Sequence, residues 1–133
     1  MLKTDFKKYS LALIKDDKII HSSKAGGLRP LAECVQKFIG KTGGCTLHDK
    51  VVGLAAARII AHSRMIDRVI TLAASKPAAQ HLREAGIALE AGETVECILN
   101  RDRTQTCPIE QKALAAKDDK TFYEEFIANC GPD

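Results

Sequence analysis

The spacing of hydrophobic residues along the chain changes between two periods, and each period indicates one kind of secondary structure. Short apolar stretches bounded by turn-forming residues predict strands at 10–15 and 19–23, and the polar residues 16–18 between them predict a hairpin. Further strands are expected at 45–48, 68–72 and 87–90. The stretch 95–100 is apolar and fits a strand or a helix equally well.

Apolar residues three or four positions apart predict helices between these strands. The first helix is expected to begin at Pro30, which suits a first helical turn, and to end at Gly40. The second is expected over 50–62 and is apolar nearly all round, which is typical of a helix buried on several sides. Asp49 directly precedes it, so we expect the Asp49 carboxylate to cap the N–H groups of its first turn.

Three more helices are expected in the C-terminal half of the chain. Ser75 is a suitable cap for a helix over 76–85, and Gly86 follows its end. Another helix is expected to begin at Pro108. Residues 118–130 are amphipathic and predict a short last helix, which would pack on the core or on another subunit.

This order of elements predicts the fold class. A hairpin followed by alternating helices and strands predicts an α/β fold with one mixed sheet and helices on both faces, a three-layer α/β/α domain. The 133 residues fit a single domain. We expect its core over about residues 8–117 and a C-terminal helix within 118–133.

Composition and charge narrow the classes of partner and the compartment. The net charge is +3, the 20 Lys and Arg are interleaved with 17 acids, and aromatic residues make up 5% with no Trp, so we expect no nucleic-acid partner. The longest apolar stretch, 51–57, is too short to span a bilayer. The N-terminus is polar and does not resemble a signal peptide, so we expect a cytoplasmic protein.

The five cysteines are odd in number and none is spaced C-x-x-C, so neither a disulfide framework nor a metal site is expected. Cys107 differs from the others because it precedes Pro108 and would be the N-cap of the fourth helix. The helix dipole lowers the pKa of a thiol in that position and makes it a better nucleophile. Glu110, at the third helical position, could reach back to the helix start as in a capping box. The alternative is that Cys107 is a small buried cap.

Two further candidate sites lie at strand ends, where open α/β sheets bind ligands. Before Pro30, Gly26 and Gly27 would let backbone N–H groups approach an anion, with Lys24 and Arg29 adding positive charge. No G-K-[ST] follows, so a plain strand-to-helix loop explains these residues as well.

At the other strand end, Asp49 and Lys50 could contact a substrate, but they could also be a helix cap and a solvated cation. The third region runs from Asn100 and Arg101 to Glu110 and contains Cys107. The candidate catalytic residues are therefore Cys107 and Asp49. The candidate ligand-binding residues are Lys24, Arg29, Lys50, Asn100, Arg101 and Glu110.

The segments D-K-V-V-G-L-A-A-A at 49–57, N-R-D at 100–102 and C-P-I-E at 107–110 resemble the bacterial and archaeal domain of unknown function family 1893. The resemblance covers about residues 8–115 and includes Gly27-Leu28-Arg29-Pro30. It implies a fold similar to cytidine deaminases, with a mixed sheet between helices, and no established activity. Arg103 and Gln105 stand where the family tends to have glycine, so a ligand could be bound differently here.

The sequence leaves several functions open but excludes zinc-dependent deamination, because it lacks both His-x-Glu or Cys-x-Glu and C-x-x-C. The first hypothesis is a pocket, without cofactor, for a nucleotide or other phosphate-bearing small molecule, with Cys107 or Asp49 acting on it. The alternative is a non-catalytic regulatory or scaffold protein that senses a ligand or forms a homodimer. Its contact would be the C-terminal helix, through Phe122, Tyr123 and Phe126. A redox-sensing Cys107 ranks last.

Overall fold

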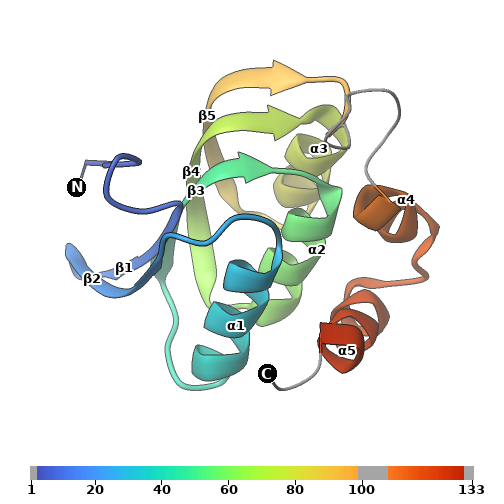
Figure 1. Cartoon of the computed structure of the whole chain (residues 1–133), viewed down its shortest axis with the longest axis horizontal. Helices are drawn as coiled ribbons and strands as arrows, with labels where there is room; N and C mark the ends of the chain where they lie inside the picture. The colour runs from blue at the N-terminus through green and yellow to red at the C-terminus, as the bar shows by residue number, and fades with distance from the viewer. Residues whose placement is uncertain (1–2, 99–107, 131–133) are drawn as a thin grey trace.

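The computed structural model describes residues 3–98 and 108–130 (Figure 1). The strands in that part of the chain are β1 (Leu11–Lys15), β2 (Lys18–Ser23), β3 (Cys45–Val52), β4 (Ile66–Ser75) and β5 (Ala88–Val95). The helices are α1 (Arg29–Phe38), α2 (Leu54–Ser63), α3 (Lys76–Glu84), α4 (Pro108–Ala115) and α5 (Asp119–Cys130). The predicted hairpin and the expected mixed α/β organisation are thus present.

The strands form one mixed sheet in the order β2-β1-β3-β4-β5. β1 is antiparallel to both of its neighbours, whereas β3, β4 and β5 are parallel. The register aligns Leu13 with Leu47, Leu47 with Val69, and Val69 with Leu89, which makes one apolar row across four strands. Because side chains alternate between the faces of a sheet, this row defines the face that the helices cover.

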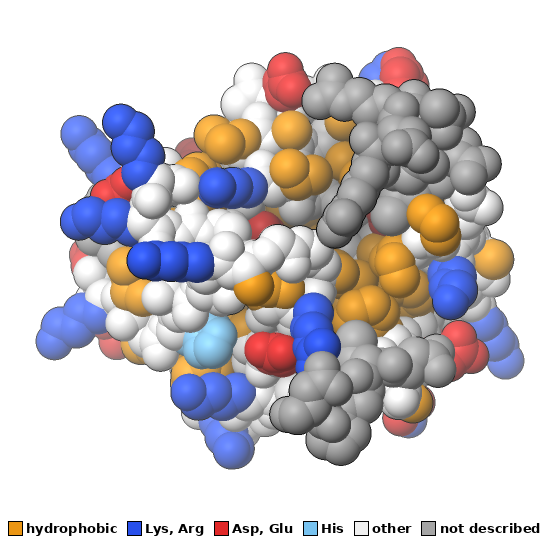
Figure 2. Space-filling model, in the orientation of Figure 1, with side chains coloured by type: hydrophobic (Ala, Val, Ile, Leu, Met, Phe, Trp, Pro, Cys, Tyr) orange, Lys and Arg blue, Asp and Glu red, His pale blue; other side chains and the backbone are white. Residues whose placement is uncertain are grey.

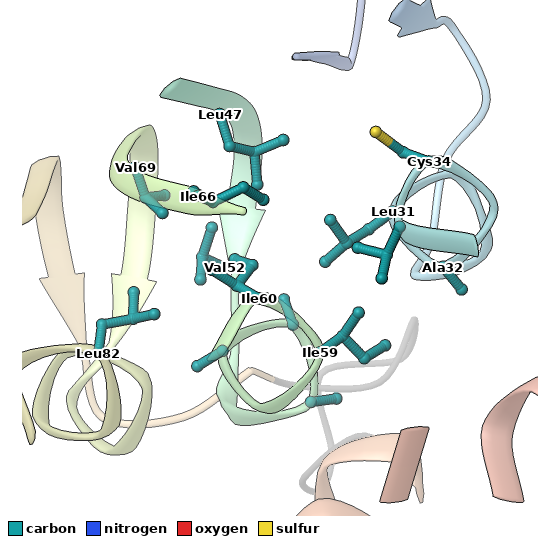
Figure 3. Packing of buried hydrophobic residues seen from close by; sticks show 14 of the residues in the cluster. Leu31, Ala32, Cys34, Leu47, Val52, Ile59, Ile60, Ile66, Val69 and Leu82 are labelled. Carbon is teal, nitrogen blue, oxygen red and sulfur yellow. The ribbon is translucent and has the colours of Figure 1, made fainter. Parts of the chain in front are cut away.

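All five described helices lie on that one face, so the expectation of helices on both faces is wrong. Figure 3 shows Leu47 and Val69 from the sheet directed toward Leu31, Ile60 and Leu82 of the first three helices. The reason lies in the strand order: β3, β4 and β5 are neighbours in chain order. Successive right-handed crossovers that advance in one direction place their helices on the same side.

α4 and α5 form an outer layer over α2, and one arginine fixes them there (Figure 1). Arg58 on α2 donates from Nε to the Ala113 carbonyl at 2.7 Å and from Nη2 to the Ala116 carbonyl at 3.3 Å. Its Nη1 donates to Asp119 Oδ1 at 2.9 Å, and His81 Nε2 lies 2.8 Å from the same oxygen. The Arg58 side chain therefore ties the end of α4 and the start of α5 to the central helix.

The opposite face of the sheet is covered in part by the N-terminal segment. Tyr9 packs there with Ala12 and Ile14, and its hydroxyl forms a 2.8 Å hydrogen bond with Nδ1 of the fully buried His48. Nε2 of His48 is buried without a hydrogen-bond partner among the residues that the structure describes. Further along this face Leu72 is 52% exposed, so the sheet has a partly uncovered apolar side.

The start of α2 also differs from the expectation. Asp49 does not cap a helix, because β3 continues through Val52 and the N-cap of α2 is Gly53. Val51 and Val52 pair with Ala73 and Ala74 of β4, and this parallel ladder outweighs the helix-like pattern of the sequence. The other caps agree with the sequence: Pro30 lies in the first turn of α1, and the Ser75 hydroxyl accepts from the Ala78 N–H at 3.2 Å.

Candidate functional site

A pocket of about 400 Å³ lies where β3 ends and where α1 and α2 begin. It brings together three segments that are distant in sequence: residues 25–30 before and in α1, residues 49–53, and residues 109–110 on α4. Its walls are largely apolar, with side chains from Leu11, Leu28, Val51, Ile98 and Ile109. A pocket of this size with few polar groups is typical of small-molecule sites.

Asp49 is the first polar group in the pocket. It lies on β3, the central strand, and is paired with Leu11 of β1 and Thr71 of β4. Burial raises the pKa of its carboxyl to about 7, although the backbone N–H groups of Lys50 and Val51 act in the opposite direction. Asp49 can therefore gain or lose a proton near neutral pH, which is what general acid–base chemistry requires.

Glu110 is the second carboxyl in the pocket, and it caps α2 from another helix. Its Oε1 accepts from the Leu54 N–H at 2.8 Å and its Oε2 accepts from the Ala55 N–H at 2.6 Å. The carboxylate of Glu110 therefore caps α2 and does not form the capping box expected within α4. It satisfies two of the N–H groups that the first turn of α2 leaves unpaired, and its charge complements the helix dipole.

Gly53 makes this contact sterically feasible. A Cβ at Gly53 would lie 1.7 Å from Glu110 Oε1 and 2.8 Å from Ile98 Cγ1. The Glu110 residue is only 6% exposed, and burial raises the pKa of its carboxyl despite the two N–H donors. Sequence reasoning missed the role of Gly53, although a glycine between two valines and a helix was the available signal.

The structure places the predicted site residues in three groups. Asp49, Lys50 and Glu110 line the pocket. Lys24 and Arg29 lie on the neighbouring loop and helix but are not lining residues, and Arg29 Nε donates to Glu33 at 3.0 Å. The remaining predicted site residues, Asn100, Arg101 and Cys107, lie outside the described residues.

Other parts of the fold offer less to a ligand. A second cavity of about 500 Å³ lies at the opposite end, against Arg64, Asp67 and Asp119. Across residues 3–98 and 108–130, no group of three or more His, Cys, Asp or Glu residues is arranged to hold a metal ion. Cys34 and Cys45 are buried free thiols and Cys97 is a half-buried one.

The surface agrees with the charge pattern of the sequence. On the face shown in Figure 2, basic side chains lie at the edges and also across the middle, with acidic ones among them, and they do not form one continuous stripe. Within the part of the chain that the structure covers, every helix is too short or too polar to cross a lipid bilayer.

The C-terminal helix packs on its own chain. Phe122 is buried in the main core, and Tyr123 and Phe126 pack against that core. The Tyr123 ring lies 4.7 Å from the His62 ring of α2, measured between centroids. These aromatic residues were the predicted contact with a second subunit, and within one chain they already have partners.

Comparison with known proteins places the chain in a family. The family model described as "Domain of unknown function (DUF1893)" matches residues 2–129. The chain belongs to the DUF1893 family. The crystal structure of a DUF1893 family protein from Thermotoga maritima (TM1506) is similar with a TM-score of 0.82 and 28% sequence identity. The alignment covers 92% of this chain and 82% of that one. No curated protein is similar in sequence at a significant level.

The match confirms the predicted family and leaves the activity open. The segment D-K-V-V-G-L-A-A-A at 49–57 contains both the pocket residue Asp49 and Gly53, which accommodates Glu110. The apolar residues of this segment, which the sequence predicts as part of a buried helix, therefore also form one wall of the pocket.

Proposed function

We propose that this DUF1893 protein binds a nucleotide or another phosphate-bearing small molecule in the pocket between β3, α1 and α4. The observation that supports the proposal is the convergence of three chain segments on one largely apolar pocket that contains two carboxyl groups. Binding pockets in α/β folds commonly occupy this position, at the carboxyl ends of parallel strands. We further propose a fold related to that of cytidine deaminases, with the difference that the described helices share one face.

The phosphate end of the ligand would lie at Gly26 and Gly27. Both glycines line the pocket directly before α1, and neither has another heavy atom near the position of a Cβ. Without a side chain at either position, an anion could approach their backbone N–H groups closely. Lys50 also lines the pocket and would add positive charge.

The other end of the ligand would lie against the apolar walls near Asp49. A planar ring fits walls formed by Leu28, Val51 and Ile98, because burial of apolar surface favours binding there. Asp49 would exchange a proton with the ligand, since its pKa of about 7 keeps both protonation states populated. We propose Asp49 as the acid–base group of any reaction in this pocket.

A ligand panel tests the proposal. Nucleoside 5′-monophosphates, ribose 5-phosphate and inorganic phosphate would be titrated into the full chain, with the melting temperature and amide chemical shifts as readouts. We expect at least one phosphate-bearing compound to raise the melting temperature, since a ligand at 100 times its Kd adds about 2.7 kcal/mol of stability. Chemical-shift changes at Gly26, Gly27 and Gly53 would place the compound in the pocket.

Two lysine variants provide the matched control. Lys50→Gln removes a charge at the pocket, whereas Lys41→Gln removes the same charge from an exposed position outside it. We expect Lys50→Gln to weaken phosphate binding several-fold and Lys41→Gln to leave it unchanged. A panel that changes neither the melting temperature nor the spectra would contradict the proposed function.

A further inference from the structure

The polar groups around Asp49 indicate which kind of chemical group the ligand presents at the end opposite its phosphate. Two side-chain hydroxyls lie nearby, that of Thr71 on β4 and that of Ser10 just before β1, and both are already engaged. The Thr71 hydroxyl donates to the Ala73 carbonyl at 3.2 Å. The Ser10 hydroxyl donates to the Ser23 carbonyl at 3.0 Å and to the Ala25 carbonyl at 2.6 Å. Neither hydroxyl donates to Asp49, and the backbone N–H groups of Lys50 and Val51 favour its charged form less than burial disfavours it.

The charged groups that line this pocket are Asp49, Lys50 and Glu110. Lys50 is exposed and forms no ion pair with Asp49. The charge of Glu110 is directed at the first turn of α2, where both of its oxygens accept backbone N–H groups. The nearby Cys34 thiol has its pKa raised to about 12 by burial and stays neutral. Among residues 3–98 and 108–130, Asp49 is thus a carboxyl group in largely apolar surroundings that forms no ion pair.

From this arrangement we infer that Asp49 binds a cationic nitrogen group of the ligand, an amidinium or an ammonium, within the pocket. The inference rests on the proposed function and specifies the end of the ligand opposite the phosphate. An ionised carboxylate in an apolar pocket is costly without a partner, and a cation with two N–H donors would satisfy it.

Three small probes of nearly the same shape show whether the pocket prefers a cationic, a neutral or an anionic group. Benzamidine is cationic, benzamide is neutral and benzoate is anionic, and each would be titrated into the full chain by amide NMR. We expect benzamidine to bind most tightly and benzoate most weakly, with shift changes at Val51, Gly26 and Gly53. Preference for benzoate, or no binding of benzamidine, would overturn the inference.

The dependence on pH gives a second, independent readout. Benzamidine stays cationic between pH 6 and pH 8, so any change in its affinity reports the protein. With an Asp49 pKa of about 7, the carboxylate form becomes dominant over this range, and the affinity should rise about tenfold. Asp49→Asn should weaken benzamidine binding and remove its pH dependence. Asp67→Asn removes the same charge at the other cavity and should leave both the affinity and its pH dependence unchanged. An unchanged pH profile in Asp49→Asn would overturn the inference.

The two proposals fail in distinguishable ways. If nucleoside monophosphates bind at Gly26 and Gly27 but benzamidine does not bind, the proposed function holds and the cation at Asp49 is wrong. If benzamidine binds and no phosphate-bearing compound does, the pocket takes a cation but not a phosphate. If neither class binds, both proposals are wrong.

Discussion

The carboxylate of Glu110 occupies the space that a side chain at position 53 would need, since a Cβ on Gly53 would lie 1.7 Å from Oε1. The contact joins α4 to the first turn of α2 across 56 residues of sequence. It also forms one corner of the pocket, because Gly53 and Glu110 both line it. One glycine therefore allows a helix cap, the docking of α4 and the shape of the candidate site at once.

Gly53→Ala should be strongly destabilising. The new methyl group cannot coexist with the Glu110 carboxylate, so the cap must move and two N–H groups lose their acceptor. We expect a loss of about 2–4 kcal/mol in urea unfolding. Gly43→Ala is the control, since no heavy atom lies within 4 Å of its Cβ position, and it should change stability by at most about 1 kcal/mol. Equal effects of the two would contradict the steric argument.

Glu110→Gln tests the cap without a change in size. The amide nitrogen cannot accept a hydrogen bond, so either the Leu54 or the Ala55 N–H is left unsatisfied in a buried position. We expect a loss of about 1–3 kcal/mol. The double variant with Gly53→Ala should lose less than the sum, because both changes remove the same contact. Full additivity in a double-mutant cycle would show that Gly53 and Glu110 act separately.

Arg58 and Arg68 are a matched pair of arginines with different expected effects. The Arg58 side chain is 14% exposed and donates to two carbonyls and Asp119, whereas the Arg68 side chain is 39% exposed and pairs with Glu90 at 3.2 Å. Arg58→Met should cost about 2–4 kcal/mol, since it removes the guanidinium that donates to two carbonyls and to Asp119, and leaves Asp119 with its His81 contact. Arg68→Met should cost at most about 1 kcal/mol. Urea unfolding of both variants at one pH makes the comparison.

Asp49 gives a pH dependence of stability with a definite sign. Its pKa in the folded state is raised from 3.8 to about 7, so the folded chain holds this proton more tightly than the unfolded chain. Stability from this group is complete below pH 4 and falls as the pH rises to about 7. Asp49→Asn should therefore raise the melting temperature by a few degrees at pH 8 and change it little at pH 4.5. No gain at pH 8, with Asp67→Asn as control, would contradict the burial argument.

Acidification should affect the stability contributed by His48, the partner of Tyr9, in the opposite direction. Burial lowers the pKa of His48, so the folded chain binds a proton at this ring less readily than the unfolded chain. Stability from this group is present above pH 6.5 and is lost progressively as the pH falls below that value. Tyr9→Phe removes the hydrogen bond to Nδ1 and should cost about 1–2 kcal/mol at pH 7.5. Tyr123→Phe is the control and should be nearly neutral in the same thermal melts.

Much of the local structure was predictable because its signals are local. Ser75 caps α3 through its own hydroxyl, and Gly86, with a φ of 77°, follows the end of that helix as expected. The hairpin of β1 and β2 follows from a polar turn between two apolar stretches. The position of Asp49 in the candidate site was also accessible, since strand ends in α/β sheets commonly lie beside ligands.

The sequence by itself determined the elements, the mixed sheet and the family, because these depend on spacing and composition along the chain. Only the tertiary structure decided that 50–52 is strand, that Glu110 caps α2 and that the described helices share one face. A local pattern cannot distinguish a buried strand from a buried helix when both need the same apolar residues. The pairing of β3 with β4 and the contact between Glu110 and Gly53 decide it, and both join residues that are far apart in the chain.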